Sequence, residues 1–413
     1  MARFLLAWEL GGGMGHMVPL VQVAQSLLQR GHEVHFVLRD LSGARSALGA
    51  LAASPQVHLW QAPVWLLPYQ AAQPSASYAE LLFHAGYLDA ERLRALVQGW
   101  QSLLDVIQPD LLLADHAPTA LLAARGRPLR RALIGSGFFL PPATQPLPSF
   151  REWERTDAQR LAYTEARVLA TCNAVLAADG RTPLAALHQL VAADEHFLLT
   201  WPELDHYSPG RQGRPGAHYW GPLPAPEQGA PALWSQGPEP PLFAYLKGDY
   251  ASLETVLQQL ARAPCRTLAH VSGLTAAQRQ RHAGARLRFS EGSVAMDSAM
   301  AQAHAVLCHA GAGTICTALQ AGLPLLLLPM QVEQLLLARR VQATGAGEVL
   351  IGADIAGRLL STLARVLGDA SLRQRAQALA ALHASTHCGD VTQRVAERCI
   401  ALAQGAPGAG AAC

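Results

Sequence analysis

Short apolar runs alternate with amphipathic stretches along the amino-terminal half of the chain. Residues Phe4 to Trp8 are apolar, and a turn rich in glycine follows at Gly11 to Gly15. From about Val18 to Arg30 apolar side chains recur at helical spacing, and Gly31 stands where helices commonly end on glycine. The same pattern predicts strands at Glu33 to Leu38, Val57 to Trp60, Asp110 to Ala114 and Ala132 to Gly135, and a helix at Asp89 to Ile107. This alternation indicates an α/β fold with a parallel sheet wrapped on both faces.

The periodicity stops between Gly221 and Pro241, where prolines crowd the chain, and then restarts. Such a segment is typical of a semi-rigid linker. We therefore predict a first domain at 1–221, a linker at 222–240, a second domain at 241–404 and a disordered tail at 405–413. The expected strands of the second domain are Leu242 to Tyr245, Arg266 to Val271, Arg286 to Phe289 and Val306 to His309. A last helix, about Asp390 to Ala403, could pack back on the first domain.

Two doubly wound parallel-sheet domains joined in this way are expected to face each other across a central cleft. The carboxyl ends of both sets of strands would line it, and open α/β sheets bind ligands at that edge. Aromatic residues are frequent from Trp60 to Tyr87 and from Phe138 to Trp153. These two stretches could form either part of the core or an apolar pocket for a small molecule.

Length, charge and cysteine content exclude several classes of protein. A chain of 413 residues has room for two domains, and a net charge of +2 gives no reason to expect a nucleic-acid partner. Seven cysteines are an odd number, without C-x-x-C spacing, which argues against a disulfide framework and against a zinc site. No apolar run reaches the roughly 18 residues of a membrane span, and no signal-peptide core is visible, so a cytoplasmic protein is expected.

The most informative segment runs from Leu307 to Gln334. An apolar strand end is followed by a turn of Gly and Ala that holds His309, a helix that starts near Thr314, and a second buried strand. Small residues let a ligand approach the backbone, and the free N–H groups at a helix start favour a phosphate. His309 is a candidate donor to phosphate oxygens, and Glu333 with Gln334 could bind sugar hydroxyls at the same edge. The segment predicts a site for a sugar attached to a diphosphate.

A second candidate site lies in the first strand-to-helix turn. His16 stands where the helix begins, and Asp115 ends a strand at the same edge of the same sheet. A carboxylate behind an imidazole fixes the tautomer and makes the ring a general base. Helix-cap and turn roles for the two residues are equally compatible with the local sequence. Binding of a nicotinamide dinucleotide is not favoured, because His16 occupies the position of the third glycine in G-x-G-x-x-G, although Asp40 could serve as the acidic ribose partner.

Motifs of both halves occur in a recognisable order. They are Gly15-His-Met-Val-Pro19, Arg30-Gly-His-Glu-Val34, Asp110 to Asp115, and the run from His309 to Gln334. Together they resemble the nucleotide-sugar-dependent glycosyltransferases of the GT-B fold, and in particular the UDP-glucuronosyl/glucosyltransferase-like family with its bacterial enzymes that glycosylate natural products. The resemblance covers nearly the whole chain and implies two Rossmann-like domains.

The resemblance also implies roles for individual residues. His16 would be the catalytic base and Asp115 its partner. The diphosphate would be held by a turn that comprises His309, Ala310, Gly311, Gly313 and Thr314. Lys247, at the end of the first strand of the second domain, could add positive charge against a phosphate, although an exposed strand-end lysine is nearly as good an interpretation.

The remaining implied contacts concern the sugar and the nucleoside. Glu333 and Gln334 would contact the donor sugar, with Gly15 near it. Ser293 and Val294 match the place where the family's backbone holds the nucleobase.

One position departs from the family's pattern. The family usually carries a glutamate three residues after the Ser or Thr of the donor turn, where it holds the ribose hydroxyls, and here Thr317 stands there. Ribose recognition would therefore be weaker, use another residue, or reflect a thymidine-type donor with a single ribose hydroxyl.

The predicted function is that of an inverting glycosyltransferase. His16, assisted by Asp115, would deprotonate a hydroxyl of a small, apolar or aromatic acceptor, which then attacks the sugar of a UDP-, TDP- or GDP-sugar donor. No cofactor or metal is expected, because the sequence has no Asp-x-Asp motif and a helix N-terminus can receive the leaving charge. The protein would be a monomer or a homodimer. The alternatives are a nucleotide-sugar epimerase of the same fold and a non-catalytic glycosyltransferase-like partner protein.

Overall fold

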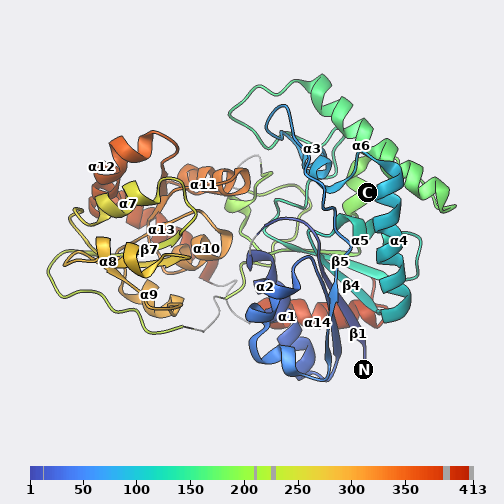
Figure 1. The fold of residues 1–413 in the computed structure, drawn as a ribbon, viewed down its shortest axis with the longest axis horizontal. Helices are drawn as coiled ribbons and strands as arrows, with labels where there is room; N and C mark the ends of the chain where they lie inside the picture. Colours follow the sequence, from blue (N-terminus) through green and yellow to red (C-terminus); the bar gives the residue numbers. More distant parts are fainter. Residues whose placement is uncertain (13, 209–211, 225–228, 385–390, 409–413) are drawn as a thin grey trace. The chain divides into compact units, whose positions relative to one another are not determined.

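The computed structural model describes residues 1–12, 14–208, 212–224, 229–384 and 391–408. They form two compact units (Figure 1). The first unit comprises Met1–Thr200, Arg214–Gly221 and helix α14 (Val391–Ala403), and the second comprises the described residues of Trp201–Gly213 and Pro222–Gly389.

The first unit is built on a parallel six-stranded sheet with the order β3-β2-β1-β4-β5-β6. Its strands are β1 (Arg3–Trp8), β2 (Glu33–Leu38), β3 (Val57–Gln61), β4 (Leu111–Asp115), β5 (Arg130–Gly135) and β6 (Glu195–Leu198). Strand β4 is buried throughout because helices cover both faces of the sheet. In register, Trp8 at the end of β1 lies beside Leu38 of β2 and Asp115 of β4. Three central strands therefore end at one edge.

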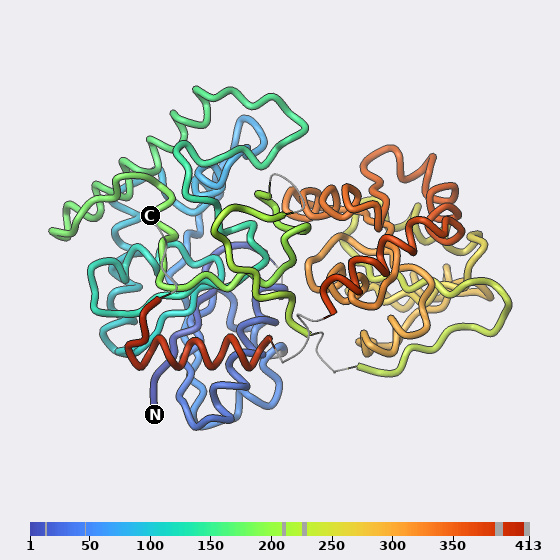
Figure 2. The backbone as a smooth tube through the Cα atoms, turned by 180° about the vertical axis from the view of Figure 1, so that it is seen from behind, coloured from blue at the N-terminus to red at the C-terminus, as the bar shows by residue number. Residues whose placement is uncertain are grey.

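Helices cover this sheet on two sides (Figure 1). One group comprises α1 (Met17–Gln29), α2 (Leu41–Leu48) and α14, and the other comprises α4 (Ala90–Ile107), α5 (Pro118–Ala124) and α6 (Ala158–Ala178). Helix α4 begins because the Asp89 carboxylate caps the N–H of Arg92 at 3.1 Å, and it buries Leu93, Val97, Trp100 and Leu104 at helical spacing. Helix α14 lies along α1, as Figure 2 shows from behind. The sequence analysis did not include α6.

The second unit repeats the architecture with a sheet of order β12-β11-β10-β7-β8-β9, again all parallel. Its strands are β7 (Pro241–Lys247), β8 (Arg266–Ser272), β9 (Leu287–Phe289), β10 (Ala305–Cys308), β11 (Leu325–Leu327) and β12 (Gly347–Val349). Alternate residues feed two separate cores: Phe243 of β7 joins one, whereas Leu242 and Ala244 join the other. Helices α7 (Leu253–Leu260) and α12 (Asp354–Gly368) contribute to the second of these cores, and α10 (Ala312–Gln320) and α11 (Val332–Thr344) to the first.

Two features of the predicted domain boundaries differ in the structure. The described residues of Trp201–Gly213 cluster with the second unit, because Trp201 and Leu204 are buried in its core. The expected linker is not free along its length: Ala230 bridges to Val294, and Trp234 is buried and donates from Nε1 to the carbonyl of Leu242 at 3.1 Å. Residues 225–228 of that linker lie outside the described residues.

The carboxyl-terminal tail also differs from the prediction where the structure describes it. Arg398 donates to the carbonyl of Pro407 at 2.8 Å, and Gly408 lies so close to Asp194 that a Cβ there would come within 2.4 Å of the Asp194 carbonyl oxygen. Residues 405–408 are therefore held against the first unit. The rest of the predicted disordered tail, 409–413, lies outside the described residues.

The cysteines and the helices bear on two of the excluded classes. The five described cysteines, Cys172, Cys265, Cys308, Cys316 and Cys399, are buried free thiols. Cys388 and Cys413 lie outside the described residues. Among the helices that the structure describes, none is both long enough and apolar enough to cross a bilayer.

Candidate active site

Each unit has a topological switch point. There, the chain connections from two adjacent parallel strands lead to opposite sides of the sheet. In the first unit it lies between β1 and β4, and in the second between β7 and β10. Open α/β sheets bind ligands outside the carboxyl ends of the strands at this point. Asp115 ends β4 and His309 directly follows β10, so the predicted residues of each unit lie at its switch point.

The structure brings His16 and Asp115 together. Nδ1 of His16 donates to Oδ1 of Asp115 at 2.8 Å, and the two side chains are only 12% and 5% exposed. Because the carboxylate can only accept, the proton of the neutral imidazole lies on Nδ1 and its lone pair on Nε2. His16 makes no side-chain hydrogen bond as the N-cap of α1, and Ala117, not Asp115, is the N-cap of α5. The helix-cap interpretation of the pair is therefore wrong.

The ring of His16 is closely surrounded by two aromatic side chains and by the backbone of Gly11. Trp8 stacks on its ring with centroids 5.6 Å apart, and Phe139 lies 5.5 Å away on centroids. Gly11 has a φ of +85°, and a Cβ on it would lie 2.5 Å from Nε2 of His16. A glycine is needed there for both reasons. Gly15 is exposed and a Cβ on it would meet nothing within 4 Å, so it leaves open space one residue before His16.

A buried carboxyl group that the sequence analysis missed lies beside this pair. Glu9 follows β1, is 1% exposed, and its Oε2 accepts from the backbone N–H of Thr119 at 2.8 Å. Burial raises the pKa of Glu9 to about 7, against the opposing effects of its hydrogen bonds to Thr119 and the charge of Arg39. Thr119 also shares a hydrogen bond of 2.9 Å between its Oγ1 and the hydroxyl of Tyr87. Glu9 thus occupies the start of α5; an acidic residue directly after an apolar strand was its only signal.

In the second unit the predicted donor turn connects β10 to α10. Ala310 has a left-handed φ of +59°, and Gly311 is the N-cap of α10 and makes no side-chain cap hydrogen bond. The N–H of Ile315 bonds the carbonyl of Gly311, so the amides of Ala312, Gly313 and Thr314 precede the first helical bond. A Cβ at Gly311 or Gly313 would meet nothing within 4 Å. The helix start is thus uncrowded and suited to an anion.

His309 has both ring nitrogens occupied by the protein. Nδ1 donates to the carbonyl of Leu328 at 2.8 Å, and Nε2 accepts from the backbone N–H of Lys247 at 3.1 Å. Burial lowers the pKa of His309, chiefly by desolvation, so the neutral ring is favoured. The prediction of a simple donor to phosphate therefore needs a correction. His309 can donate from Nε2 only after it gains a proton and releases the N–H of Lys247.

The predicted donor residue Gln334 and the departing residue Thr317 are both hydrogen-bonded within the second unit. Gln334 is buried, and its Oε1 accepts from the N–H of Met330 at 2.8 Å, which holds the turn before α11. Thr317 is buried and donates from Oγ1 to the carbonyl of Gly313 at 2.9 Å, inside α10. Thr317 keeps only acceptor capacity. Glu333 is partly exposed in the first turn of α11.

Lys247 and the Ser293–Val294 segment complete the predicted set. Lys247 ends β7 with an exposed side chain, and among the described residues no ion pair holds its ammonium group. The carbonyl of Ser293 accepts from the N–H of Ala230 at 2.9 Å, and Val294 is buried. Ala230, in the segment predicted as a linker, therefore forms a β-bridge with the segment predicted to hold a nucleobase.

An aromatic pair next to this segment was not singled out from the sequence. Tyr245 of β7 is 39% exposed, and His270 of β8 stacks on it with centroids 5.2 Å apart and planes 23° apart. Nδ1 of His270 lies 2.9 Å from the carbonyl of Gly292, in the loop that leads to Ser293. Aromatic residues at two adjacent strand ends were the available signal. The flat, exposed ring of Tyr245 is suited to stacking against a base.

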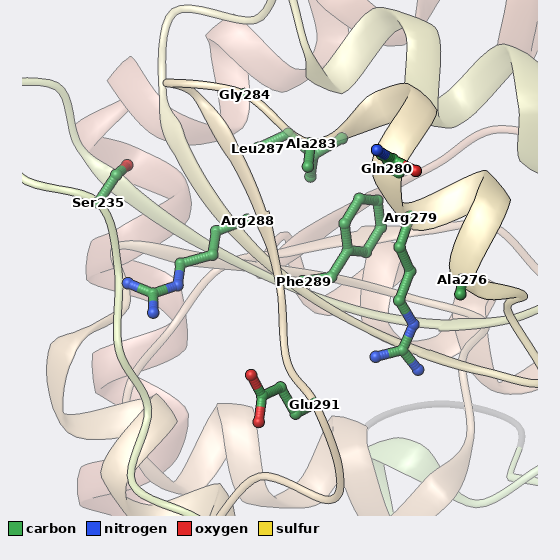
Figure 3. A pocket seen from close by; sticks show the side chains of 10 residues that line it. All are labelled: Ser235, Ala276, Arg279, Gln280, Ala283, Gly284, Leu287, Arg288, Phe289 and Glu291. Atoms are coloured by element: carbon green, nitrogen blue, oxygen red, sulfur yellow. The ribbon is translucent and has the colours of Figure 1, made fainter.

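The described cavities lie away from the strand ends that carry the predicted residues. A cavity of about 450 Å³ in the second unit lies against α8 (Ala276–His282) and β9 (Figure 3). It is lined by Ser235, Ala276, Arg279, Gln280, Ala283, Gly284, Leu287, Arg288, Phe289 and Glu291. A second cavity, of about 280 Å³, lies in the first unit beside the ion pair of Glu80 and Arg160. Neither includes a predicted catalytic or donor-binding residue, but Tyr69 and Phe83, from the first aromatic stretch, line the second cavity.

One cluster of the first unit has the composition of a metal site. Glu33, His35 and His58 place a potential ligand atom each within 4.8 Å of one another, at the amino-terminal ends of β2 and β3. Nε1 of Trp60 donates to Nδ1 of His35 at 3.1 Å, so the proton of neutral His35 lies on Nε2, which donates to Glu33 at 3.1 Å. A metal at Nε2 would need that proton displaced and Trp60 turned away. The geometry fits a satisfied hydrogen-bonded network better than a metal centre.

Comparisons with known proteins agree with the fold. Residues 265–402 match the family model described as erythromycin biosynthesis protein CIII-like, C-terminal domain. A zeaxanthin glucosyltransferase of Pseudescherichia vulneris is 29% identical over 223 residues, which cover 53% of this chain and 49% of that protein. The matched region thus spans about half the length of this curated relative.

Solved glycosyltransferase structures match over nearly the whole chain. The calicheamicin glycosyltransferase CalG4 has a TM-score of 0.69 at 18% identity and covers 98% of each chain. The glycosyltransferase SsfS6 of Streptomyces sp. SF2575, complexed with thymidine diphosphate, has a TM-score of 0.64 at 18% identity and covers 96% of this chain and 100% of that one. The fold is that of the GT-B glycosyltransferases, and the curated proteins to which the chain is similar are themselves glycosyltransferases.

Proposed function

We propose that this protein is an inverting glycosyltransferase that moves a sugar from a nucleoside-diphosphate sugar to a hydroxyl of a small acceptor. The observation that carries the proposal is the hydrogen bond of 2.8 Å from Nδ1 of His16 to Asp115 at the first switch point. The carboxylate orients the ring, directs its lone pair to Nε2, and stabilises the imidazolium that forms when the base takes a proton.

In the proposed step, Nε2 of His16 takes the proton of the acceptor hydroxyl. The acceptor oxygen forms a bond to the anomeric carbon, and the bond from that carbon to the β-phosphate oxygen breaks. The nucleoside diphosphate leaves with the electron pair, and the configuration at the anomeric carbon inverts. Nothing else is consumed, and the proton on His16 passes to solvent when the product leaves.

The leaving diphosphate would be received by the second unit. The uncapped amides of Ala312, Gly313 and Thr314 at the start of α10 suit an anion, and the ammonium group of Lys247 adds charge at the neighbouring strand end. His309 would join as an imidazolium, with its Nε2–H turned to phosphate instead of to Lys247. These contacts would make a divalent metal unnecessary.

We propose a thymidine diphosphate sugar as the donor. Thr317 offers one neutral oxygen where related enzymes place a carboxylate. A single oxygen suits a deoxyribose, which has one free hydroxyl group, better than it suits the diol of a ribose. The solved structure of SsfS6 contains thymidine diphosphate, which supports the same choice. The acceptor would be apolar or aromatic, because Trp8 and Phe139 flank His16. An epimerase needs no acceptor base, so the His16–Asp115 pair favours transfer over that alternative.

The test combines thermal shift with hydrolysis and transfer assays over UDP-, TDP- and GDP-glucose. We expect TDP-glucose to stabilise the protein most, and His16→Ala to bind it equally well while its turnover falls by about a thousandfold. His58→Ala, a change to a histidine at the opposite end of the same sheet, is the matched control. Absence of stabilisation by every nucleotide would refute the donor site, and unchanged turnover in His16→Ala would remove His16 from the base role.

A further inference from the structure

A second histidine stands next to the proposed base and has no role in the reaction described above. His116 directly follows Asp115 and is 9% exposed. Neither Nδ1 nor Nε2 of its ring has a hydrogen-bond partner among the described residues, although both atoms are shielded from solvent. Buried polar groups are nearly always paired in folded proteins, so two unpaired ring nitrogens in one residue indicate a missing partner.

The ring of His116 is held firmly in its place. Phe139 stacks on it with centroids 3.5 Å apart and planes 14° apart, and Tyr78 lies 5.9 Å away on centroids. The backbone of His116 has a left-handed φ of +45°, and its carbonyl accepts from the N–H of Leu10 at 3.0 Å. A non-glycine residue adopts this conformation at a cost, so the surrounding structure must hold it there. The ring cannot readily turn to find a partner elsewhere.

His116 and His16 both lie beside Gly11. Their ring centroids are 6.2 Å apart, and a Cβ on Gly11 would lie 2.5 Å from Nε2 of His16 and 3.4 Å from Nδ1 of His116. The reactive nitrogen of His16 and one nitrogen of His116 are therefore no more than about 6 Å apart. Hydrogen bonds of about 2.8 Å from these two nitrogens can reach two oxygens on neighbouring atoms of one molecule.

We propose that His116 binds a second oxygen of the acceptor, adjacent to the hydroxyl that His16 activates, and this inference rests on the proposed function. The acceptor class is a flat aromatic molecule with two neighbouring oxygens, such as an ortho-diol or an ortho-hydroxy carbonyl compound. Phe139, stacked on His116 and close to His16, supplies the apolar wall for its ring.

The charge state of His116 suits this role. Desolvation by burial, followed by the neighbouring charge of His16, holds the pKa of His116 well below its usual range. A contact of the ring with the backbone of Leu10, too poorly aligned to count as a hydrogen bond, opposes this lowering. Arg39 adds to the lowering. Neutral imidazole offers one donor and one acceptor, which matches a hydroxyl or a carbonyl, and it does not compete with His16 for the substrate proton.

The experiment compares two probes that differ by one oxygen, 2-naphthol and 2,3-dihydroxynaphthalene. Their dissociation constants are measured by titration with the full-length protein, and kcat/KM is measured with the preferred nucleotide sugar. We expect the wild-type protein to prefer the diol by about tenfold, the effect of one hydrogen bond. His116→Phe keeps an aromatic ring against Phe139 but removes both nitrogens, and its ratio should fall to about one.

Two further variants keep the result interpretable. His116→Asn retains a donor and an acceptor and tolerates the left-handed backbone, so it should keep most of the preference for the diol. His58→Phe makes the same substitution at the far end of the sheet and should keep the wild-type ratio. An equal affinity of the wild-type protein for both probes, or a diol preference that survives in His116→Phe, overturns the proposal.

The outcome is separable from that of the proposed function, because nucleotide binding and donor hydrolysis are measured without acceptor. Loss of the diol preference in His116→Phe together with no response to any nucleotide sugar would keep the binding site and reject glycosyl transfer. Active transfer with an unchanged ratio in His116→Phe would support glycosyl transfer and reject the binding role of His116.

Discussion

The turns that follow β4 and β10 occupy equivalent places in two sheets of the same strand order, yet they are built for different partners. In each, a non-glycine residue with a left-handed backbone, His116 or Ala310, leads from a central strand toward a helix. At the start of α5 the protein supplies its own carboxyl group, since Glu9 accepts from Thr119. At the start of α10 no side-chain cap is present. The difference teaches that one helix start is closed and the other is open to an anion.

Two candidate site histidines, His16 after β1 and His309 after β10, differ in a similar way. His16 donates to a carboxylate, which strengthens it as a base, whereas His309 donates to the carbonyl of Leu328 and accepts from the N–H of Lys247. Both rings carry their proton on Nδ1. The two rings differ in the group that accepts this proton and in the surroundings of Nε2. These differences make His16 a candidate base, whereas His309 must be protonated before it can donate to phosphate.

The largest effect should come from Asp115→Asn, which breaks the feature that distinguishes His16 from His309. The amide can donate to the imidazole and favour the wrong tautomer, so we expect kcat to fall by about a thousandfold. The dissociation constant for TDP-glucose, measured by calorimetry, should stay within about twofold, because the proposed donor contacts are made by residues of the other unit. A parallel loss of donor affinity would show that the pair also serves the donor.

Glu9→Gln tests whether the closed helix start is held by a neutral carboxyl group. With a folded-state pKa of about 7, raised from 4.5, Glu9 keeps its proton in the folded protein while the unfolded chain loses it. The contribution of Glu9 to folding stability is therefore fully present below the unfolded pKa of 4.5. It is lost as the pH rises from there through the folded-state pKa of about 7. Gln keeps the acceptor for Thr119 without that decline, so at pH 8 the variant should be more stable by roughly 3 kcal/mol.

Urea unfolding of wild type and Glu9→Gln at pH 5 and pH 8 measures this difference. The gain should nearly vanish at pH 5, where both side chains are neutral in the folded state. A variant that is less stable than wild type at pH 8 would mean that the pKa of Glu9 is not raised in the folded protein and that Arg39 stabilises its carboxylate.

Gly313→Asp tests the open helix start. A Cβ fits at Gly313 without contact within 4 Å, and an acidic residue in a first helical turn does not destabilise the helix. The added charge should repel the diphosphate and weaken binding of TDP-glucose by about 30-fold, while the melting temperature stays unchanged or rises slightly. Gly357→Asp, in the first turn of α12, also meets open space and is the matched control. Equal affinities in all three proteins would mean that the diphosphate binds elsewhere.

The smallest effect concerns the proton at His309. Burial lowers the pKa of His309 in the free protein, and a bound diphosphate would raise it, so binding takes up a proton. Affinity for TDP-glucose, whose diphosphate does not titrate near neutrality, should therefore increase as pH falls from 8 to 6, by up to about tenfold. His309→Asn should flatten this dependence. A wild-type affinity that is independent of pH would show that His309 stays neutral and does not contact phosphate.

Much of the architecture was readable from the sequence because it depends on local pattern. The apolar run Phe4 to Trp8 and the run Glu33 to Leu38 became β1 and β2, since both faces of a parallel sheet must be covered by apolar side chains. The proximity of His16 and Asp115 followed from two strands whose carboxyl ends share an edge. The open start of α10 followed from Gly311 and Gly313, whose lack of side chains is a property of the sequence itself.

What the sequence could not determine is which polar groups use each other as partners. His309, Gln334 and Thr317 have the residue types of a donor site, but only the fold shows that their atoms are already paired with Lys247, Met330 and Gly313. Conversely, neither Glu9 nor His116 belongs to a sequence motif. Only the fold places the carboxyl group of Glu9 at the start of α5 and buries the ring of His116 without a hydrogen-bond partner among the described residues. Hydrophobic periodicity is local and survives in the sequence, whereas hydrogen-bond pairing and desolvation depend on residues brought together from far along the chain.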